Sequence, residues 1–240
     1  MINFQEKANF IWSVADLLRG DYKQSEYGKV ILPLTVLRRL DSVLEPSKEQ
    51  VLALMDSLKD AEYDVEPIVL TQIGLPFYNA SKFDFEKLKA DPSNIATNLR
   101  NYINGFSKSA LEIIQYFNFE TQIDRLDKAD LLYLVVSKFS EIDLHPDRVS
   151  NHEMGYIFEE LIRKFSEISN ETAGEHFTPR EVIRLMVNIL FNEDDDLLRK
   201  ESIIKTMYDP ACGTGGMLSV AQEYMHELNE AARLVLFGQE

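Results

Sequence analysis

The stretch IIKTMYDPACGTGG, residues 203–216, decides the fold of the C-terminal part of this chain. Residues 203–208 are a short apolar run compatible with a β-strand, and a glycine-rich turn follows directly. A helical run to about Ala232 comes next, and the apolar RLVLF at 233–237 predicts a second strand. A strand, a glycine-rich turn, a helix and a strand in this order predict the opening of a doubly wound parallel sheet.

The glycine-rich turn, DPACGTGG at residues 209–216, lies at the carboxyl end of the first predicted strand. Glycines there let backbone amides approach a ligand closely, and the following helix directs its positive end into the same crevice. A ligand with anionic and polar groups fits such a turn. The spacing is not that of a dinucleotide fingerprint, because no glycine stands three residues after Gly215.

Two further segments carry candidate ligand-binding residues. Glu240 ends the second strand and follows Gly216 by 24 residues, close to the interval at which an acid accepts hydrogen bonds from ribose hydroxyls. In GEHFTPRE, residues 174–181, Thr178 to Glu181 form a capping-box pattern with Pro179 at the first helical position, so a helix N-terminus is predicted there. The alternatives are an exposed glutamate and an ordinary helix start. No metal site is predicted at His176, since no second His or Cys stands at ligand spacing.

The first two thirds of the chain are predicted to be helical. Apolar periodicity predicts helices at residues 4–18, ending before Gly20, and 27–44, where Pro33 should kink or restart the helix. A capping-box pattern at residues 47–50 opens another, residues 63–91 are expected to be irregular, and Asp91-Pro92 restarts a helix. Further helices are predicted at about 107–118 and 128–142. The break at residues 145–147, followed by a new cap at 150–153, predicts a domain junction.

Composition narrows the class of protein. The 240 residues include 45% hydrophobic side chains, enough for one large or two ordinary domains with their own cores. One cysteine, no apolar run of membrane-spanning length and an N-terminus unlike a secretory signal predict a soluble, cytoplasmic protein. The net charge of −15 argues against a broad phosphate-binding surface. The basic pairs Arg38-Arg39 and Arg163-Lys164 are interpreted as solvated helix faces without a functional role.

Taken together, these motifs resemble one family. The string DPACGTGG resembles methyltransferase motif I, and FTP at residues 177–179 precedes it as motif X does in amino-directed DNA methyltransferases. The strings IWSVADLLRG (11–20), YGKVIL (27–32) and LRRL (37–40) look like the helical N-terminal domain of type I restriction-modification subunits. The resemblance covers nearly the whole chain and is least specific at residues 63–108.

The resemblance implies a helical N-terminal assembly domain at residues 1–147, followed at 148–240 by the start of a Rossmann-like, S-adenosylmethionine-dependent methyltransferase domain. The implied reaction is methyl transfer to the exocyclic amine of adenine in double-stranded DNA. The implied partners are a second modification subunit, a specificity subunit that reads the DNA sequence, and a restriction subunit. The implied cofactor-binding residues are Glu175, His176, Phe177, Thr178, Pro179, Asp209, Gly213, Thr214, Gly215 and Glu240.

One departure from the family pattern is decisive for catalysis. The family's catalytic Asn-Pro-Pro motif, with Phe or Tyr after it, occurs nowhere in this sequence, so no catalytic residue is assigned. A two-stranded sheet is also less than an open α/β core normally needs, so the chain is expected to be a fragment, inactive by itself. Two alternatives stay open. A nicotinamide-dependent oxidoreductase is disfavoured by the glycine spacing, and a non-enzymatic assembly module that docks specificity or restriction subunits is a serious contender.

Overall fold

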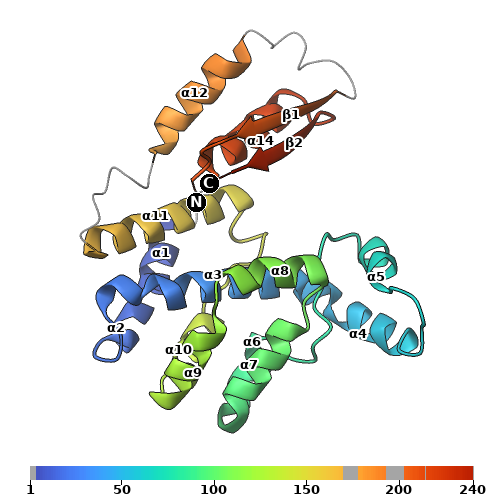
Figure 1. The fold of residues 1–240 in the computed structure, drawn as a ribbon, viewed down its shortest axis with the longest axis vertical. Coiled ribbons are helices and arrows are strands. Elements are labelled where there is room, and N and C mark those ends of the chain that lie inside the picture. Colours follow the sequence, from blue (N-terminus) through green and yellow to red (C-terminus); the bar gives the residue numbers. More distant parts are fainter. Residues whose placement is uncertain (1–3, 170–177, 193–202, 214, 240) are drawn as a thin grey trace. The chain divides into compact units, whose positions relative to one another are not determined.

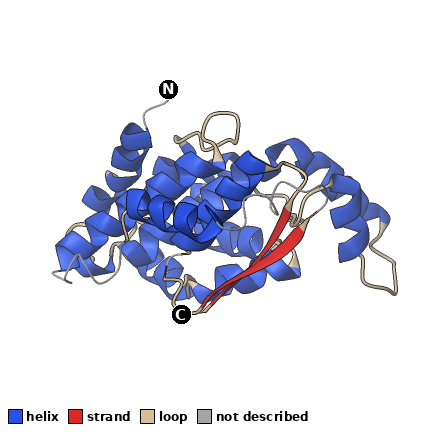
Figure 2. Ribbon diagram, turned by 90° about the horizontal axis from the view of Figure 1, so that it is seen from above, coloured by secondary structure: helices blue, strands red, loops and turns tan. Residues whose placement is uncertain are grey.

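A computed structural model describes residues 4–169, 178–192, 203–213 and 215–239. The chain divides into two compact units, residues 1–169 and 170–240, which are described separately (Figure 1). The first unit is helical, and the second contains both strands. Figure 2 shows how strongly helix predominates among the described residues.

The helical unit consists of short helices joined by tight turns. Its elements are α1 (Phe4–Trp12), α2 (Val14–Leu18), η1 (Gln24–Glu26), α3 (Gly28–Leu44), η2 (Glu45–Ser47), α4 (Lys48–Ser57), α5 (Glu66–Ile73), α6 (Phe85–Lys89), η3 (Pro92–Asn94), α7 (Ile95–Asn104), α8 (Lys108–Tyr116), α9 (Glu120–Lys128), α10 (Leu132–Ser140) and α11 (Asn151–Ser169).

The core of this unit gathers apolar side chains from helices far apart in the sequence. Leu34 and Leu37 of α3, Leu99 of α7 and Phe139 of α10 are fully buried in one cluster. Tyr102 lies edge-on to Phe85, with ring centroids 6.0 Å apart. Most of the stripes predicted from helical periodicity therefore meet in one main core, and Val51 of α4, Val69 of α5 and Tyr78 form a smaller second cluster. Such packing is the usual source of stability for short helices.

Two of the predicted helices differ in detail from the structure. The predicted helix at residues 4–18 is broken at Ser13, whose hydroxyl donates to the Phe10 carbonyl at 2.6 Å, while Gly20 has the positive φ of +103° suited to a helix end. Pro33 does not start a new helix, since α3 runs continuously from Gly28 to Leu44. Because Pro33 lies only five residues beyond the first residue of α3, its missing N–H removes one hydrogen bond near the start of the helix, and the helix continues past it.

Residues 63–91 are more ordered than predicted. They contain α5, which ends at Gly74 in the left-handed conformation, and α6, whose N-cap Asp84 accepts from the Lys87 amide at 2.8 Å. Helix α9 was not predicted either. Proline and glycine in this stretch mark the ends of helices instead of an irregular segment.

Helix α11 belongs spatially to the helical unit. Phe165 contacts Trp12 of α1 with ring centroids 5.2 Å apart, and Lys164 donates to Asn9 at 2.8 Å. Gly28 of α3 also lies against the Phe165 ring. The compact unit therefore ends at Ser169, beyond the junction predicted at residues 145–147, because the apolar stripe of α11 is buried on this unit.

The interpretation of Arg38 and Arg39 as solvated residues was wrong. Arg39 is buried, and its guanidinium donates to the Leu144 carbonyl, to the Val149 carbonyl at 2.8 Å and to Asn151 at 2.8 Å. Arg38 donates to the Ile142 carbonyl at 2.9 Å and pairs with Asp41. These two residues hold the connection from α10 to α11 against α3, because its carbonyls need donors away from water.

The α/β unit contains α12 (Arg180–Asn192), β1 (Ile204–Asp209), α14 (Gly216–Leu228) and β2 (Arg233–Gly238). The strands pair in parallel from Ile204 opposite Arg233 to Asp209 opposite Gly238. This strand, turn, helix and strand order is the one predicted from residues 203–237. Helices α12 and α14 run side by side in the same direction. Ile183, near the start of α12, packs at Gly216, the first residue of α14, and farther along both helices the ring centroids of Phe191 and Tyr224 are 5.7 Å apart.

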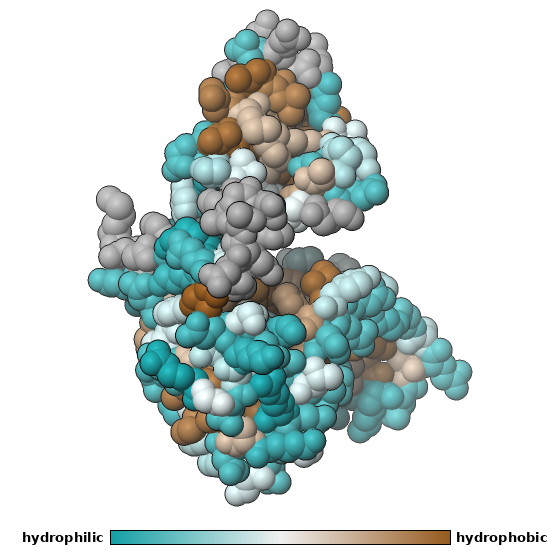
Figure 3. Space-filling model, turned by 60° about the vertical axis from the view of Figure 1, so that its left-hand side comes forward, coloured by the Kyte–Doolittle hydropathy of each residue, from teal (hydrophilic) through white to brown (hydrophobic). Residues whose placement is uncertain are grey.

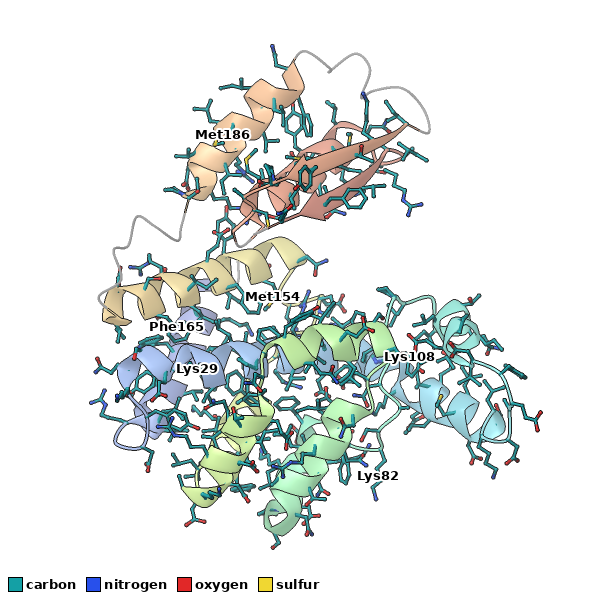
Figure 4. The ribbon with its side chains drawn as sticks, in the orientation of Figure 1. Lys29, Lys82, Lys108, Met154, Phe165 and Met186 are labelled. Atoms are coloured by element: carbon teal, nitrogen blue, oxygen red, sulfur yellow. The ribbon has the colours of Figure 1, made fainter. Side chains whose placement is uncertain are left out.

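Apolar side chains of the α/β unit lie on both sides of its elements. Ile183, Val187 and Val220 are buried between α12 and α14, with Met207 of β1 and Leu234 of β2 packed against them. A second set is exposed on the outer face of α12 and on the strands: Val182, Leu185, Met186, Ile189, Leu190, Ile204, Tyr208 and Phe237. Figure 3 shows hydrophobic side chains gathered on the surface of this unit, and Met186 is labelled on α12 in Figure 4.

None of the helices in the described parts of the chain is both long and apolar enough to cross a bilayer.

Candidate functional site

The candidate site is the turn between β1 and α14. It begins at Asp209, the last residue of β1, and ends at Gly215, the N-cap of α14. Gly213 and Gly215 both have positive φ angles, +50° and +79°, which residues with a side chain seldom adopt. The glycines predicted from the sequence therefore have a conformational reason to be there.

Hydrogen bonds tie this turn to the end of β2. The Cys212 amide donates to the Gln239 carbonyl at 2.9 Å, and the Gln239 amide donates to the Asp209 carbonyl at 2.9 Å. The Tyr208 hydroxyl adds a bond of 2.5 Å to the Gln239 side chain. The carboxyl ends of both strands and the glycine turn thus form one connected edge.

Asp209 has a local structural role in addition to any contact with a ligand. Its carboxylate accepts from the Ala211 amide at 3.2 Å, an Asx turn that starts the loop. The Gly215 amide then closes the loop by donating to the Cys212 carbonyl at 2.8 Å. The acid at this position therefore shapes the backbone that presents the glycines.

The glycine turn faces open space. A Cβ atom built on Gly213 or Gly215 would meet no atom within 4 Å, so a ligand can approach the backbone there. The first turn of α14 lies directly behind, and the first amides of a helix have no carbonyl four residues earlier to bond. An anionic or polar group bound at the N-terminus of α14 would meet these amides and the positive end of the helix.

The N-terminus of α12 lies at the same end of the unit. Thr178 and Pro179 are exposed and precede α12, which begins at Arg180 instead of at the predicted Pro179. The Pro179 carbonyl accepts from the Val182 and Ile183 amides at 3.0 and 3.1 Å. Since Ile183 also packs at Gly216, the first turns of α12 and α14 are neighbours. Glu175, His176, Phe177, Thr214 and Glu240 lie outside the described residues.

The sequence interpretation missed Arg180 as a positioning residue. It is buried, and its guanidinium contacts both carboxylate oxygens of Glu223 in α14 at 2.8 and 2.9 Å. A cation in the first turn opposes the helix dipole, so an arginine at this position was a signal that it needs an acidic partner. The pair joins the first turn of α12 to the middle of α14.

Two glycines outside the predicted set make close packing possible. A Cβ on Gly216 would lie 2.7 Å from the Cδ1 atom of Ile183, and one on Gly238 would lie 2.9 Å from the Sγ atom of Cys212. Gly216 therefore lets α12 approach α14, and Gly238 lets β2 approach the turn. The sequence contains both glycines in recognisable motifs, but only the fold shows which neighbours they admit.

Two models of known protein families match this chain. A model of the N-6 DNA Methylase family matches residues 149–240, which include the glycine turn. A model of the HsdM N-terminal domain matches residues 7–139, more than half of the chain. The chain therefore belongs to the HsdM family of type I modification subunits.

Two relatives with known names support this assignment. The chain is 26% identical over 255 residues to the type I restriction enzyme MjaIX methylase subunit of Methanocaldococcus jannaschii, covering 98% of this chain and 42% of that protein. It is 33% identical over 129 residues to the EcoEI methylase subunit of Escherichia coli, covering 54% and 24%. It thus spans less than half the length of these relatives.

A solved structure shows the same fold. It is the methyltransferase subunit of a type I restriction-modification system from Streptococcus thermophilus, with a TM-score of 0.63 and 17% identity, covering 99% of this chain and 53% of that one.

Proposed function

We propose that this chain is the S-adenosylmethionine-binding portion of a site-specific DNA adenine-N6 methyltransferase subunit of a type I restriction-modification complex. The observation that carries the proposal is the open glycine turn between β1 and α14, with two positive-φ glycines and no atom within 4 Å of either Cβ position. The β1–α14–β2 unit is, on this proposal, the start of a Rossmann-like methyltransferase domain.

The residues around the turn fit the polar ends of this cofactor. The first turn of α14 and the neighbouring first turn of α12 can hold the carboxylate of its methionine part. Gly213 and Gly215 let that part lie against the backbone, and residues 175–179 are proposed to line the same end. Glu240 is proposed to accept hydrogen bonds from the ribose hydroxyls. When bound, the cofactor supplies a methyl group on a positively charged sulfur.

The helical unit is proposed to mediate assembly with a second modification subunit, a specificity subunit and a restriction subunit. The net charge of −15 supports a division of labour in which the specificity subunit makes most of the contacts to DNA phosphates. An assembly module without cofactor binding remains the alternative. Co-purification with a specificity subunit but no calorimetric signal for S-adenosylmethionine would favour that alternative.

Calorimetric titration of S-adenosylmethionine into the full-length subunit and its variants tests the proposal. We expect Gly213→Ala to weaken binding at least tenfold, because a Cβ at φ +50° strains the turn and enters the space beside it. Asp209→Asn should weaken binding less. Gly74→Ala is the matched control, a second positive-φ glycine that lies in the helical unit. Equal affinities for wild type and Gly213→Ala, with folding intact, would refute the site.

Methyl transfer is proposed to require residues beyond this chain. The extruded adenine must be gripped so that its amine meets the methyl group, and the family's Asn-Pro-Pro motif is absent from the 240 residues. Labelled-methyl transfer to unmethylated DNA, with a specificity subunit supplied and full-length subunit as control, should give no incorporation by this chain. Robust incorporation would place the catalytic site elsewhere.

A further inference from the structure

A cavity of about 450 Å³ lies in the helical unit, separate from the glycine turn of the α/β unit. It is lined by the end of α3, by the starts of α4 and α6, and by α7. Lys48, Asp41, Asn79 and Tyr102 are among its lining residues. The function proposed above uses none of these residues.

Lys48 points its amine at neutral oxygens. The Nζ atom donates to the Phe83 carbonyl at 2.9 Å and to the Asn79 side-chain oxygen at 3.2 Å. In the described part of the chain, Lys48 forms no ion pair with a carboxylate. Both acceptors can also bind an uncharged amine, so these two hydrogen bonds do not require the proton. The Tyr102 ring, whose centroid lies 5.8 Å from Nζ, and the Asp41 and Asp84 carboxylates favour the charged form.

The electrostatics follow from this arrangement. Burial lowers the pKa of Lys48 to about 8, although Asp41 and Asp84 partly offset the loss of solvation and Lys87 adds to the lowering. An uncharged lysine amine has two N–H groups and one lone pair. Two N–H groups given to Phe83 and Asn79 leave the lone pair unshared, in a cavity that has room for a reagent.

The charged side chains that line the cavity determine which kind of reagent can reach Lys48. Asp41 is paired with Arg38 at 2.9 Å, and Asp84 with Lys87 at 2.7 Å, so these four charges largely neutralise one another. Three further carboxylates, Glu45, Glu49 and Glu86, line the cavity from exposed positions. They repel an anion approaching Lys48. An uncharged electrophile meets no such barrier.

We propose that Lys48 is a nucleophilic lysine and that this cavity is a site of covalent acylation by small, uncharged acyl donors. The lone pair of Nζ attacks the acyl carbon and forms an N–C bond. The bond from that carbon to the leaving group breaks, and the leaving group takes its electron pair. The proton lost from Nζ goes to solvent.

Acylation would change the local structure. An acylated Nζ keeps a single N–H, so it can serve the Phe83 carbonyl or the Asn79 oxygen but not both. Asn79 also donates to the Tyr102 carbonyl at 2.8 Å and accepts from the Ser81 amide, so the change would reach the loop that leads into α6. The modification would therefore loosen the contact between α4 and this loop.

The experiment is competitive acetylation of the folded chain with limiting acetic anhydride, with each lysine quantified by peptide mass spectrometry. Lys82, an exposed lysine one residue before Phe83, is the internal reference (Figure 4). At pH 7.5 we expect Lys48 to react at least tenfold faster than Lys82, because the lowered pKa of Lys48 leaves a larger share of its amine uncharged at that pH. The Lys48 rate should level off above about pH 8.5.

Two variants and a second reagent complete the test. Lys48→Arg should lose the fast site, whereas Lys82→Arg should leave the Lys48 rate unchanged. Pyridoxal 5′-phosphate, an anionic carbonyl reagent trapped by borohydride, should show no preference for Lys48, but the Glu45→Gln/Glu49→Gln double variant should increase its reaction there. A Lys48 rate equal to or below that of Lys82 in protein shown to be folded by circular dichroism, or a rate still rising at pH 9.5, would overturn the proposal.

Discussion

The helical and α/β units bury their apolar side chains to very different extents. Among the described residues, 32 buried apolar side chains form the main cluster of the helical unit, whereas six form that of the α/β unit. Four large apolar side chains are exposed in the first unit and eight in the second. The helical unit has a core of its own, whereas large apolar side chains are exposed on α12 and on the strands in the described part of the α/β unit.

The difference in apolar burial affects how the stability of the α/β unit relates to the proposed cofactor site. Parallel strands are usually covered on both faces, so the exposure of Ile204, Tyr208 and Phe237 is unusual for a parallel sheet. The glycine turn is nevertheless held by main-chain bonds between β1, the loop and β2. The small core therefore limits the stability of the α/β unit more than it affects the backbone geometry of the glycine turn.

The largest expected effect compares a core residue with an exposed one. Phe139→Ala should lower the free energy of unfolding of the helical unit by about 3–5 kcal/mol, because it empties a fully buried position. Ile189→Ala on α12, where the side chain is 65% exposed, should change stability by less than about 0.5 kcal/mol. Urea unfolding followed by circular dichroism measures both. A large loss from Ile189→Ala would mean that the outer face of α12 is covered in solution.

A second test concerns the connection to α11. Arg39→Met should destabilise the helical unit by about 2–3 kcal/mol, because the Leu144 and Val149 carbonyls lose a charged donor in a buried position. Arg163→Met is the matched control. Arg163 lies on the exposed side of α11. Among the described residues it pairs with Glu160 and Glu167 of the same helix, which contributes about 0.5 kcal/mol. Equal losses from the two variants would contradict the role assigned to Arg39.

These two arginines show where sequence reasoning reaches its limit. Periodicity predicted most of the helices, and the order of residues 203–237 predicted both strands and the turn between them. Such signals are local, because they depend on spacing within one segment. The partners of Arg39 lie more than 100 residues away, so nothing near LRRL at 37–40 distinguishes a buried donor from a solvated one.

Some features of the candidate site likewise follow from local sequence, whereas others depend on the packing of distant residues. The positive φ angles of Gly213 and Gly215 follow from a local motif and could be predicted. The bond between Arg180 and Glu223, and the contact of Gly216 with Ile183, depend on how α12 packs on α14. Side-chain capping was also predicted only in part. Ser150 caps α11 as expected, but the Ser47 hydroxyl donates to the Leu44 carbonyl instead of capping α4.

A third prediction uses the pH dependence of Lys48. Its pKa is lowered to about 8 in the folded chain, so between pH 8 and 10.5 the unfolded chain binds more protons than the folded one. The buried charge of Lys48 therefore lowers the free energy of unfolding below pH 8, and this loss is recovered as the pH rises to 10.5. Because Lys48 is only half-buried, the gain should be about 1 kcal/mol. Lys48→Met should lose this rise, and Lys82→Met should retain it. Identical pH profiles of unfolding for all three proteins would contradict the effect.

The smallest expected effect decides which unit α11 unfolds with. Ser150 and Glu153 form a reciprocal capping box, in which the Glu153 amide donates to the Ser150 hydroxyl at 3.2 Å and the Ser150 amide donates to the Glu153 carboxylate at 2.8 Å. Ser150→Ala should therefore cost about 1 kcal/mol, and Ser47→Ala, whose hydroxyl caps no helix, only a few tenths. Because α11 packs on Trp12 and Gly28, the loss should appear in the transition of the helical unit, as monitored by the fluorescence of Trp12. If Ser150→Ala leaves that transition unchanged and lowers a second one, α11 unfolds with the α/β unit, and the functional boundary lies near residue 149, where the N-6 DNA Methylase match begins.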